Sequence, residues 1–257
     1  MQKPREIIDK IYERHLISQC KHTPKHIAII QDGNRRFAKE KGVDVSVGHK
    51  LGARKTEKVL EWAQEMGVRH ITLYCFSTEN FNRSEYELKE LFDLFTEKAL
   101  AIAKDERVNK NKIRIQMVGN RELVPTGLME KIEHVEQLTK DHEGFTINLA
   151  LAYGGRNEIL IATRSILEKV KAGELKPEDI TTKTIEENLY QEINIPPVDL
   201  IIRTGNEKRT SNFLPWLANG NESAVYFCAP YWPVFRKIDL LRGIRVYDQR
   251  IKNSHLP

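Results

Sequence analysis

The stretch HIAIIQDGNRRF, residues 26–37, decides the fold of this chain. Its apolar first half predicts a buried strand, and Asp32-Gly33-Asn34 predicts a tight turn that leads into a helix. Free backbone N–H groups gather where a strand passes into a helix N-terminus, and the guanidinium groups of Arg35 and Arg36 add positive charge there. Asp32 adds a ligand for a divalent cation beside this anion site. We interpret the stretch as a site for a diphosphate and a metal ion.

The composition is that of a globular chain with a small excess of positive charge. The 257 residues are 40% hydrophobic, and 41 Lys and Arg against 36 Asp and Glu give a formal charge of +5. This length suits one large α/β domain. The excess fits anionic substrates or an anionic membrane surface, and it is too small to indicate a nucleic-acid partner.

The three cysteines, Cys20, Cys75 and Cys228, lie far apart and form no Cys-x-x-Cys pair. This spacing argues against a zinc site and a disulfide framework, and it favours a reducing compartment. The N-terminus is polar and charged, so no signal peptide is expected. No apolar run approaches the roughly 20 residues of a membrane span. We expect a cytoplasmic protein that contacts a membrane only peripherally, if at all.

Segments with strand patterns alternate with segments of helical periodicity along the whole chain. The expected strands are 26–30, 70–77, 112–119, 145–153, 198–203 and 224–229, and the expected helices are 51–66, 85–104, 125–141, 157–171, 182–191 and 237–252. This alternation predicts an α/β fold with a central, six-stranded, mainly parallel sheet flanked by helices. No linker divides the chain, so we expect one domain over residues 26–257, preceded by a helical arm over residues 1–25.

The expected helix over residues 85–104 is more apolar than a surface helix needs to be. Its Leu, Phe, Ala and Ile residues cover more than one stripe, whereas a helix on the surface needs only one. The surplus fits a helix with one face in the core and another lining an apolar cavity. An ordinary central helix explains the pattern equally well.

Charged and polar residues follow four of the expected strands. They are Asp32, Asn34, Arg35 and Arg36, then Ser77, Asn80 and Arg83, then Gly154, Gly155 and Arg156, and last Arg203, Arg209 and Ser211. In an open parallel sheet, ligands bind beyond the carboxyl ends of the strands. Arginine forks suit phosphate oxygens, and a lone carboxylate suits Mg²⁺ shared with phosphates. Each arginine alone is more often a solvated surface charge; their coincidence at strand ends favours a site for two diphosphates.

Five segments, in order along the chain, resemble the motifs of cis-prenyltransferases, the family of undecaprenyl and dehydrodolichyl diphosphate synthases. They are residues 26–37, the Gly48-His49 pair, LYCFSTENFNR at 73–83, residues 148–156 with Tyr-Gly-Gly-Arg, and residues 199–213 with Arg-Thr-Gly-x-Glu-x-Arg-x-Ser. The Arg35-Arg36 pair and the N-terminal arm are more similar to archaeal or eukaryotic members than to bacterial ones. The absence of P-loop, dinucleotide and Gly-x-Ser-x-Gly motifs is consistent with this resemblance.

The resemblance implies a homodimer with a hydrophobic tunnel that uses Mg²⁺ to add isopentenyl diphosphate to an allylic prenyl diphosphate, with a new cis double bond. The implied catalytic residues are Asp32, Ser77 and Asn80, and the implied metal ligands are Asp32 and Glu222. The residues implied for the allylic diphosphate are Gly33, Asn34, Arg35, Arg36, Phe37, His49, Phe81 and Arg83. Those implied for isopentenyl diphosphate are Arg203, Arg209 and Ser211, and those for the tunnel are Cys75, Leu91, Phe95 and Phe145.

The chain departs from the family pattern at several positions. Val45 stands where members usually have an arginine before Gly-His, and Val234 stands where an acid commonly follows Trp-Pro. Phe145 stands where a smaller residue often lies near the tunnel floor, which suggests a shortened product. Two alternatives therefore stay open: a different prenyl condensation with another second substrate or a short product, and a non-catalytic partner subunit. The second is less favoured because the Asp-Gly-Asn motif is kept.

Overall fold

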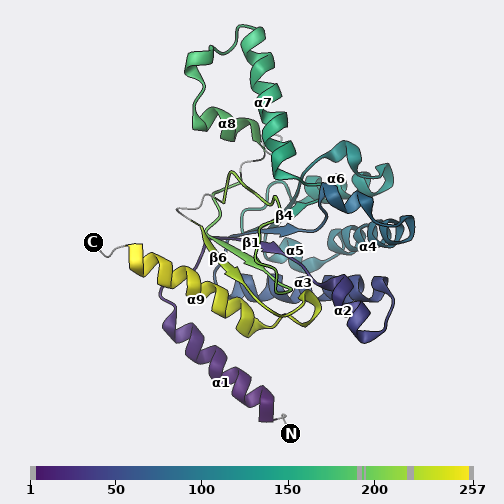
Figure 1. The fold of residues 1–257 in the computed structure, drawn as a ribbon, viewed down its shortest axis with the longest axis vertical. Coiled ribbons are helices and arrows are strands. Elements are labelled where there is room, and N and C mark those ends of the chain that lie inside the picture. The colour runs from purple at the N-terminus through teal and green to yellow at the C-terminus, as the bar shows by residue number, and fades with distance from the viewer. Residues whose placement is uncertain (1–3, 190–192, 194, 219–222, 255–257) are drawn as a thin grey trace.

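The computed structural model describes residues 4–254 apart from 190–192, 194 and 219–222. Its centre is a six-stranded sheet with the order β3-β4-β2-β1-β5-β6, in which every neighbouring pair is parallel (Figure 1). The strands are β1 (His26–Ile30), β2 (His70–Tyr74), β3 (Ile113–Val118), β4 (Phe145–Ala150), β5 (Leu200–Arg203) and β6 (Ala224–Phe227). The predicted α/β class and the six strands are confirmed.

The helices connect the strands and cover both faces of the sheet. They are α1 (Pro4–Gln19), α2 (Asn34–Lys41), α3 (Val45–Glu65), α4 (Glu85–Ala103), α5 (Glu106–Lys110), α6 (Thr126–Thr139), α7 (Gly155–Lys171), α8 (Thr182–Asn188) and α9 (Lys237–Ser254). Short 3₁₀ turns occur at Thr78–Asn82, Arg121–Leu123, Pro177–Asp179 and Trp232–Val234. Among the described residues, no helix combines the length and apolar character needed to cross a membrane.

Several element boundaries differ from the sequence prediction, and local capping explains two of them. Helix α3 begins at Val45, because the Asp44 side chain accepts a hydrogen bond from the Ser46 N–H at 2.8 Å and caps it. The Gly48-His49 pair therefore lies inside this helix, whereas we expected it before the helix. Strand β2 ends at Tyr74, because Ser77 caps the 3₁₀ turn that follows and draws the chain out of the sheet.

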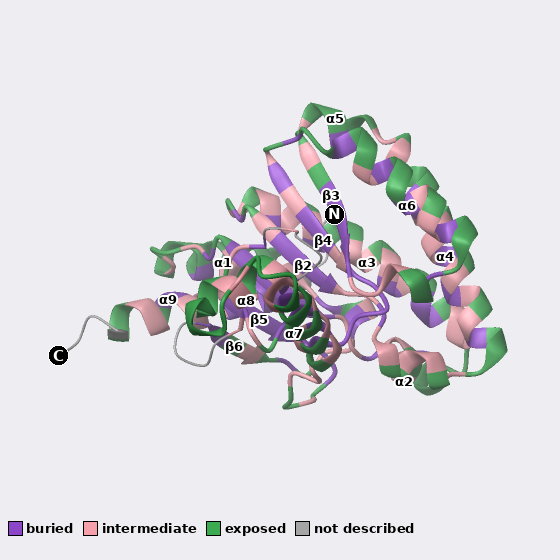
Figure 2. Ribbon diagram, turned by 90° about the horizontal axis from the view of Figure 1, so that it is seen from above, coloured by how far each residue is buried: buried purple, intermediate pink, exposed green. Residues whose placement is uncertain are grey.

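The central strands β1, β2, β4 and β5 are largely buried on both faces, whereas the edge strands β3 and β6 each carry exposed residues, as Figure 2 shows by their colour. On one face Ile29, Leu73 and Ile147 pack in a cluster with residues of α3, α6 and α9. On the other face Ile30 and Ala150 pack in a second cluster with residues of α7 and of the segments around β5. Because both faces are covered, the strand sequences read as near-continuous apolar runs.

A row of buried polar side chains crosses four strands on the α7 face of the sheet. His26 Nε2 lies 2.8 Å from Thr72 Oγ1, Asn148 Nδ2 donates to the same hydroxyl at 2.9 Å, and Gln116 Nε2 donates to Asn148 Oδ1 at 2.7 Å. His26 Nδ1 lies 2.8 Å from the Pro196 carbonyl oxygen. Burial lowers the pKa of His26 to about 4, so the ring is neutral near neutral pH.

The N-terminal helix α1 lies against α9 and extends away from the sheet (Figure 1). Leu16 on α1 packs with Ile238 and Leu241 on α9, and all three side chains are buried. At the end of the arm, the buried Asp248 carboxylate accepts hydrogen bonds from the Lys21 and His22 N–H groups at 3.0 and 2.9 Å. The other side of α1 carries exposed isoleucines, among them Ile8 and Ile11.

Candidate active site

The candidate site lies where the strand order reverses. Strand β1 pairs with β2 on one side and with β5 on the other, which makes its carboxyl end the switch point of this open sheet. In the β1–β5 register Ile30 lies opposite Arg203, the last residue of β5. The segment that follows Ile30 therefore meets the end of β5, although the two are about 170 positions apart in sequence.

Asp32 is held between two arginines at this point. Its Oδ2 accepts a hydrogen bond from Arg203 Nη2 at 2.7 Å, and its Oδ1 lies 3.0 Å from Arg36 Nη2. The Arg203 side chain is 4% exposed and that of Asp32 is 27% exposed. The carboxylate is thus fixed by a buried guanidinium on one side while it still faces the cavity described below.

The turn after Asp32 requires a glycine. Gly33 has φ +113°, and a Cβ at this position would lie 2.7 Å from the Tyr231 ring. The Trp232 N–H donates to the Asp32 carbonyl oxygen at 3.0 Å and so fixes the turn against the segment after β6. Any other residue would therefore strain the backbone and push Tyr231 away.

Arg203 also organises the loop that follows its own strand. Its Nη1 donates to Ser211 Oγ and to the Arg209 carbonyl oxygen, each at 2.6 Å. Four residues of this loop that are not glycine have a positive φ: Asn206, Ser211, Asn212 and Leu214. Such conformations cost about 1–3 kcal/mol each and are typical of functional loops. Arg203 Nε is buried and has no partner in the structure.

Glu207 links two arginines of the site, and we did not predict it. Its Oε1 lies 3.3 Å from Arg36 Nη1, and its Oε2 accepts from Arg209 Nη1 at 2.6 Å. The carboxylate therefore sets the spacing of two guanidiniums that come from different strand ends. Its place two residues before Arg209, in the fifth matched segment, was the signal that could have revealed it.

Glu87 brings two arginines and a histidine together on the α3 side of the cavity. This carboxylate is 5% exposed; its Oε1 lies 2.9 Å from Arg83 Nη1 and 3.1 Å from His49 Nε2, and its Oε2 lies 3.4 Å from Arg35 Nε. Burial lowers the pKa of His49 below its usual range. The family resemblance implied Arg35, Arg83 and His49 for the site and matched Glu87 to an acidic family position, but it did not show that Glu87 contacts all three.

Ser77 and Asn80 stand at the end of β2. The Ser77 N–H donates to Asn80 Oδ1 at 3.1 Å, so the amide is turned back toward the start of the 3₁₀ turn. Both residues line the cavity.

Most of the predicted site residues lie on the wall of one cavity. Those that line it are Asp32, Gly33, Asn34, Arg35, Arg36, His49, Ser77, Asn80, Arg83, Arg203, Arg209 and Ser211. Phe37 and Phe81 are not part of the wall, and Phe81 packs instead against Phe76, with ring centroids 4.9 Å apart. Glu222 lies outside the described residues.

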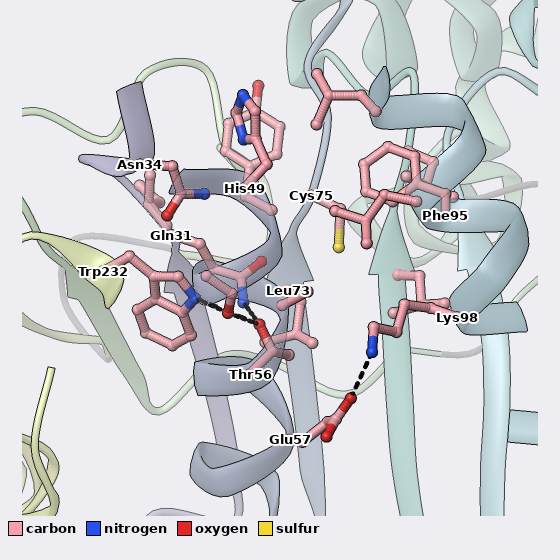
Figure 3. A pocket seen from close by; sticks show the side chains of 18 of the residues that line it. Gln31, Asn34, His49, Thr56, Glu57, Leu73, Cys75, Phe95, Lys98 and Trp232 are labelled. Atoms are coloured by element: carbon pink, nitrogen blue, oxygen red, sulfur yellow. Dashed lines mark hydrogen bonds and ion pairs between the residues drawn. The ribbon is translucent and has the colours of Figure 1, made fainter. Parts of the chain in front are cut away.

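The cavity has a volume of about 1580 Å³ and extends from the ends of β1 and β5 along the sheet (Figure 3). Its wall includes all four residues predicted for a tunnel, namely Cys75, Leu91, Phe95 and Phe145. Small-molecule pockets usually measure about 300–1,000 Å³. A cavity of this size and apolar lining fits a long hydrocarbon chain.

The donor set fits magnesium held jointly with a substrate. Among the described residues, no three His, Cys, Asp or Glu side chains come together as a metal cage. Mg²⁺ is commonly bound by one or two carboxylates together with substrate phosphates and waters. Asp32, half-buried and at the mouth of an arginine-lined cavity, offers one such carboxylate.

The two family departures fall at different places. Val45 lines the cavity, so the missing arginine leaves the wall one cation short there. Val234 is 47% exposed and is not part of the wall.

Comparison with known proteins settles the family. Residues 30–254 match the family model described as "Putative undecaprenyl diphosphate synthase". The chain belongs to this family. The cis-prenyltransferase resemblance noted in the sequence is thereby confirmed.

Curated relatives are similar over nearly the whole of this cis-prenyltransferase. The tritrans,polycis-undecaprenyl-diphosphate synthase (geranylgeranyl-diphosphate specific) of Archaeoglobus fulgidus is 52% identical over 95% of this chain and 97% of its own. The protein of the same name from Halobacterium salinarum is 49% identical over 93% of this chain and 79% of its own. The expected similarity to archaeal members is confirmed.

Solved structures share the fold. Lavandulyl diphosphate synthase from Lavandula x intermedia, in complex with dimethylallyl diphosphate, superposes with a TM-score of 0.82 at 34% identity, over 88% of this chain and 95% of its own. A probable undecaprenyl diphosphate synthase from Campylobacter jejuni gives a TM-score of 0.71 at 29% identity over the same shares.

Proposed function

We propose that this cis-prenyltransferase condenses isopentenyl diphosphate with geranylgeranyl diphosphate and repeats the addition until it reaches undecaprenyl diphosphate. The archaeal relatives whose names carry this activity support the choice of primer and product. The observation that carries the proposal is Asp32 held between Arg203 and Arg36 at the mouth of a large, mostly apolar cavity.

Each diphosphate is assigned to one of two groups of residues on the cavity wall. Gly33, Asn34, Arg35, Arg36, Arg83 and His49 would hold the allylic diphosphate at the turn and the N-terminus of α2, where backbone N–H groups and arginines attract phosphate oxygens. Arg203, Arg209 and Ser211 would hold isopentenyl diphosphate. The two groups meet at Asp32, so the reacting ends would be close together.

Asp32 would hold Mg²⁺ together with the diphosphates. The metal would neutralise the charge that develops on the leaving diphosphate as the allylic C–O bond breaks. Arg36, which also contacts Asp32, is placed to share that neutralisation. Ser77 and Asn80 would orient the condensing groups or assist the removal of the proton whose loss forms the new double bond. The apolar wall would keep water from the electron-poor allylic carbon.

The cavity would serve as the tunnel for the growing chain. Cys75, Leu91, Phe95 and Phe145 lie along it, with Phe145 at the start of β4, the end of the sheet remote from Asp32. The sequence suggested that Phe145 shortens the product, whereas the undecaprenyl product in the relatives' names supports a full-length product. The family resemblance further supports a homodimer, and the product's apolar chain supports a peripheral contact with a membrane.

The experiment is a product analysis by mass spectrometry. The enzyme is incubated with isopentenyl diphosphate, Mg²⁺ and, in separate reactions, dimethylallyl, farnesyl or geranylgeranyl diphosphate. We expect extension of geranylgeranyl diphosphate to undecaprenyl diphosphate as the main reaction. No extension of any primer would favour a non-catalytic partner subunit. A product that contains only one added unit would favour the alternative of a different prenyl condensation with a short product. The similarity to lavandulyl diphosphate synthase is the observation that supports this alternative.

A further inference from the structure

Gln31 places an uncharged polar side chain between the apolar strand β1 and the acid of the site. It follows Ile30, the last residue of β1, and precedes Asp32. Its side chain reaches Thr56 on α3, on the face of the sheet where the cavity lies, and it lines that cavity. No step of the proposed function uses this side chain.

Thr56 fixes the direction in which the Gln31 amide points. The Thr56 hydroxyl donates to the Gly52 carbonyl oxygen at 3.1 Å, and a hydroxyl has only one hydrogen to donate. The contact with Gln31 is therefore made by the amide Nε2, which donates to Thr56 Oγ1 at 2.6 Å. Gln31 Oε1 is thus turned away from Thr56. Figure 3 shows this oxygen turned toward the side of the cavity on which Leu73 and Cys75 lie.

Trp232 holds this hydrogen-bonded group against the turn that carries Asp32. Its indole N–H donates to the Gly52 carbonyl oxygen at 2.9 Å and lies 3.3 Å from Thr56 Oγ1. Its backbone N–H donates to the Asp32 carbonyl oxygen at 3.0 Å, and the residue is only 1% exposed. The Gln31 amide is therefore part of a rigid unit, and its dipole is oriented before any substrate binds.

This unit borders a residue that we assign to the allylic diphosphate. A Cβ added to Gly52 would lie 2.5 Å from Asn34 Oδ1, so the Gly52 backbone and the Asn34 side chain are in close contact. Gln31 is also adjacent to Asp32 in sequence, with about 3.8 Å between their Cα atoms. The first carbons of an allylic chain whose diphosphate is held at Asn34 would therefore lie beside the Gln31 oxygen.

The proposed reaction creates a positive charge at these first carbons. The allylic C1–O bond breaks, and its electron pair leaves with the diphosphate. The positive charge is shared by C1 and C3 until the double bond of isopentenyl diphosphate supplies the electrons for the new bond to C1, after which a proton is lost from C2 of the added unit. Hydrocarbon walls cannot stabilise this charge, whereas the negative end of a fixed carbonyl dipole can.

We propose that the Gln31 amide oxygen stabilises the positive charge on the allylic fragment, and that Thr56 is the positioning residue that orients it. This inference rests on the proposed function, because the charge forms only in that reaction. It assigns the task to an oxygen atom and not to the bulk of the side chain.

The test measures the binding of two analogues of geranylgeranyl diphosphate by isothermal titration calorimetry with Mg²⁺. In one analogue an ammonium nitrogen replaces C3 and carries the charge; in the other, sulfur replaces the bridging oxygen and the hydrocarbon stays neutral. For Gln31→Leu we expect the affinity for the ammonium analogue to fall about tenfold and that for the sulfur analogue to change less than about twofold. An equal loss for both analogues, or no loss for either, would overturn the proposal.

Steady-state kinetics give a second readout of the same variant. Because the charge is absent from the bound substrate and present in the transition state, Gln31→Leu should lower kcat by about tenfold or more and leave KM for geranylgeranyl diphosphate unchanged. A variant that raised KM at an unchanged kcat would show that Gln31 only shapes the wall.

The positioning role is tested at Thr56. Thr56→Val keeps the shape of the side chain but frees the Gln31 amide, so the affinity for the ammonium analogue should fall about threefold. Thr56→Ser keeps the hydroxyl and should restore the wild-type affinity. Wild-type affinity in Thr56→Val would contradict the positioning role.

Gln64→Leu is the matched control. Gln64 also lies on α3 and lines the cavity, eight residues beyond Thr56 or about 12 Å along the helix. It should keep the wild-type preference between the two analogues, and an equal change there would count against the proposal.

Should Gln31→Leu fail to fold, Gln31→Asn tests the same point. It keeps the amide but withdraws the oxygen by one methylene, and it should show the same selective loss; an unchanged preference would overturn the inference. Failure of the proposed function would appear differently, as a wild-type enzyme that extends no primer.

Discussion

At the scale of single residues, Asp32 contacts two arginines and is also the carboxylate that we propose for the metal ion. Its two oxygens contact different arginines, Arg203 and Arg36, at 2.7 and 3.0 Å. These contacts compensate the negative charge of the carboxylate. Phosphate oxygens are also bidentate partners for guanidinium groups, so a bound diphosphate would share these arginines with the carboxylate and leave Asp32 oxygens available to a metal ion.

A lysine at position 203 tests the geometry of this arrangement. Arg203 contacts Asp32, Ser211 and the Arg209 carbonyl oxygen at once, which a planar fork can do and an ammonium group cannot. For Arg203→Lys we expect kcat/KM for isopentenyl diphosphate to fall roughly a hundredfold, about 2.7 kcal/mol of transition-state stabilisation. Steady-state kinetics with the second substrate varied measures it.

Arg164→Lys on the exposed face of α7 is the matched control and should behave as the wild type. If Arg203→Lys retained the wild-type kcat/KM, a positive charge at position 203 would suffice for the use of isopentenyl diphosphate, without the guanidinium fork. The hydrogen-bond network around Asp32 would then not hold the second substrate.

At the scale of elements, the polar row across the sheet joins β1, β2, β4 and β3. The His26 Nδ1–H donates to the Pro196 carbonyl oxygen, so Nε2 accepts from the Thr72 hydroxyl. Asn148 and Gln116 continue the chain in the same direction. Protonation of the His26 ring would put a hydrogen on Nε2, which could then no longer accept from the Thr72 hydroxyl, so this link makes the row sensitive to protonation.

The row predicts a loss of stability at mildly acidic pH. Burial lowers the pKa of His26 to about 4 in the folded chain, whereas an unfolded histidine titrates near about 6.5. The unfolded state therefore binds the proton first as pH falls below 6.5. The free energy of unfolding should drop between pH 6.5 and 4, by about 3 kcal/mol from this residue, and should not depend on His26 above pH 6.5.

Urea unfolding at several pH values measures this dependence. His26→Gln keeps hydrogen-bonding capacity but does not titrate, so its unfolding free energy should fall less steeply than the wild type's between pH 6.5 and 4. Parallel pH profiles for the two proteins would contradict the assignment.

At the scale of the whole molecule, topology explains why so much was predictable from the sequence. Alternating strand and helix patterns predict the parallel sheet, and a parallel sheet places Asp32 and Arg203 at one edge without any knowledge of contacts. The 2.7 Å contact between them confirms that reasoning. The sequence left two interpretations of the helix over residues 85–104 open, a central helix and a helix that also faces a cavity; Leu91 and Phe95 of α4 line the cavity, which supports the second.

Other features depend on tertiary contacts that no local pattern encodes. Glu87 and Glu207 each contact two arginines from different elements. Local sequence does not distinguish a glutamate that contacts two arginines from a glutamate that faces solvent. Phe81 follows the pattern of a site residue but packs against Phe76 instead.

The central claim is that the Asp32 carboxylate holds a magnesium ion between two diphosphates. The most direct measurement is the steady-state turnover of Asp32→Asn at saturating isopentenyl and geranylgeranyl diphosphate with Mg²⁺. Asparagine keeps the shape and can still accept a hydrogen bond from Arg203, but it lacks the charge. The account predicts a fall in kcat of about a thousandfold or more, with an unchanged circular dichroism spectrum; turnover within tenfold of the wild type would contradict it.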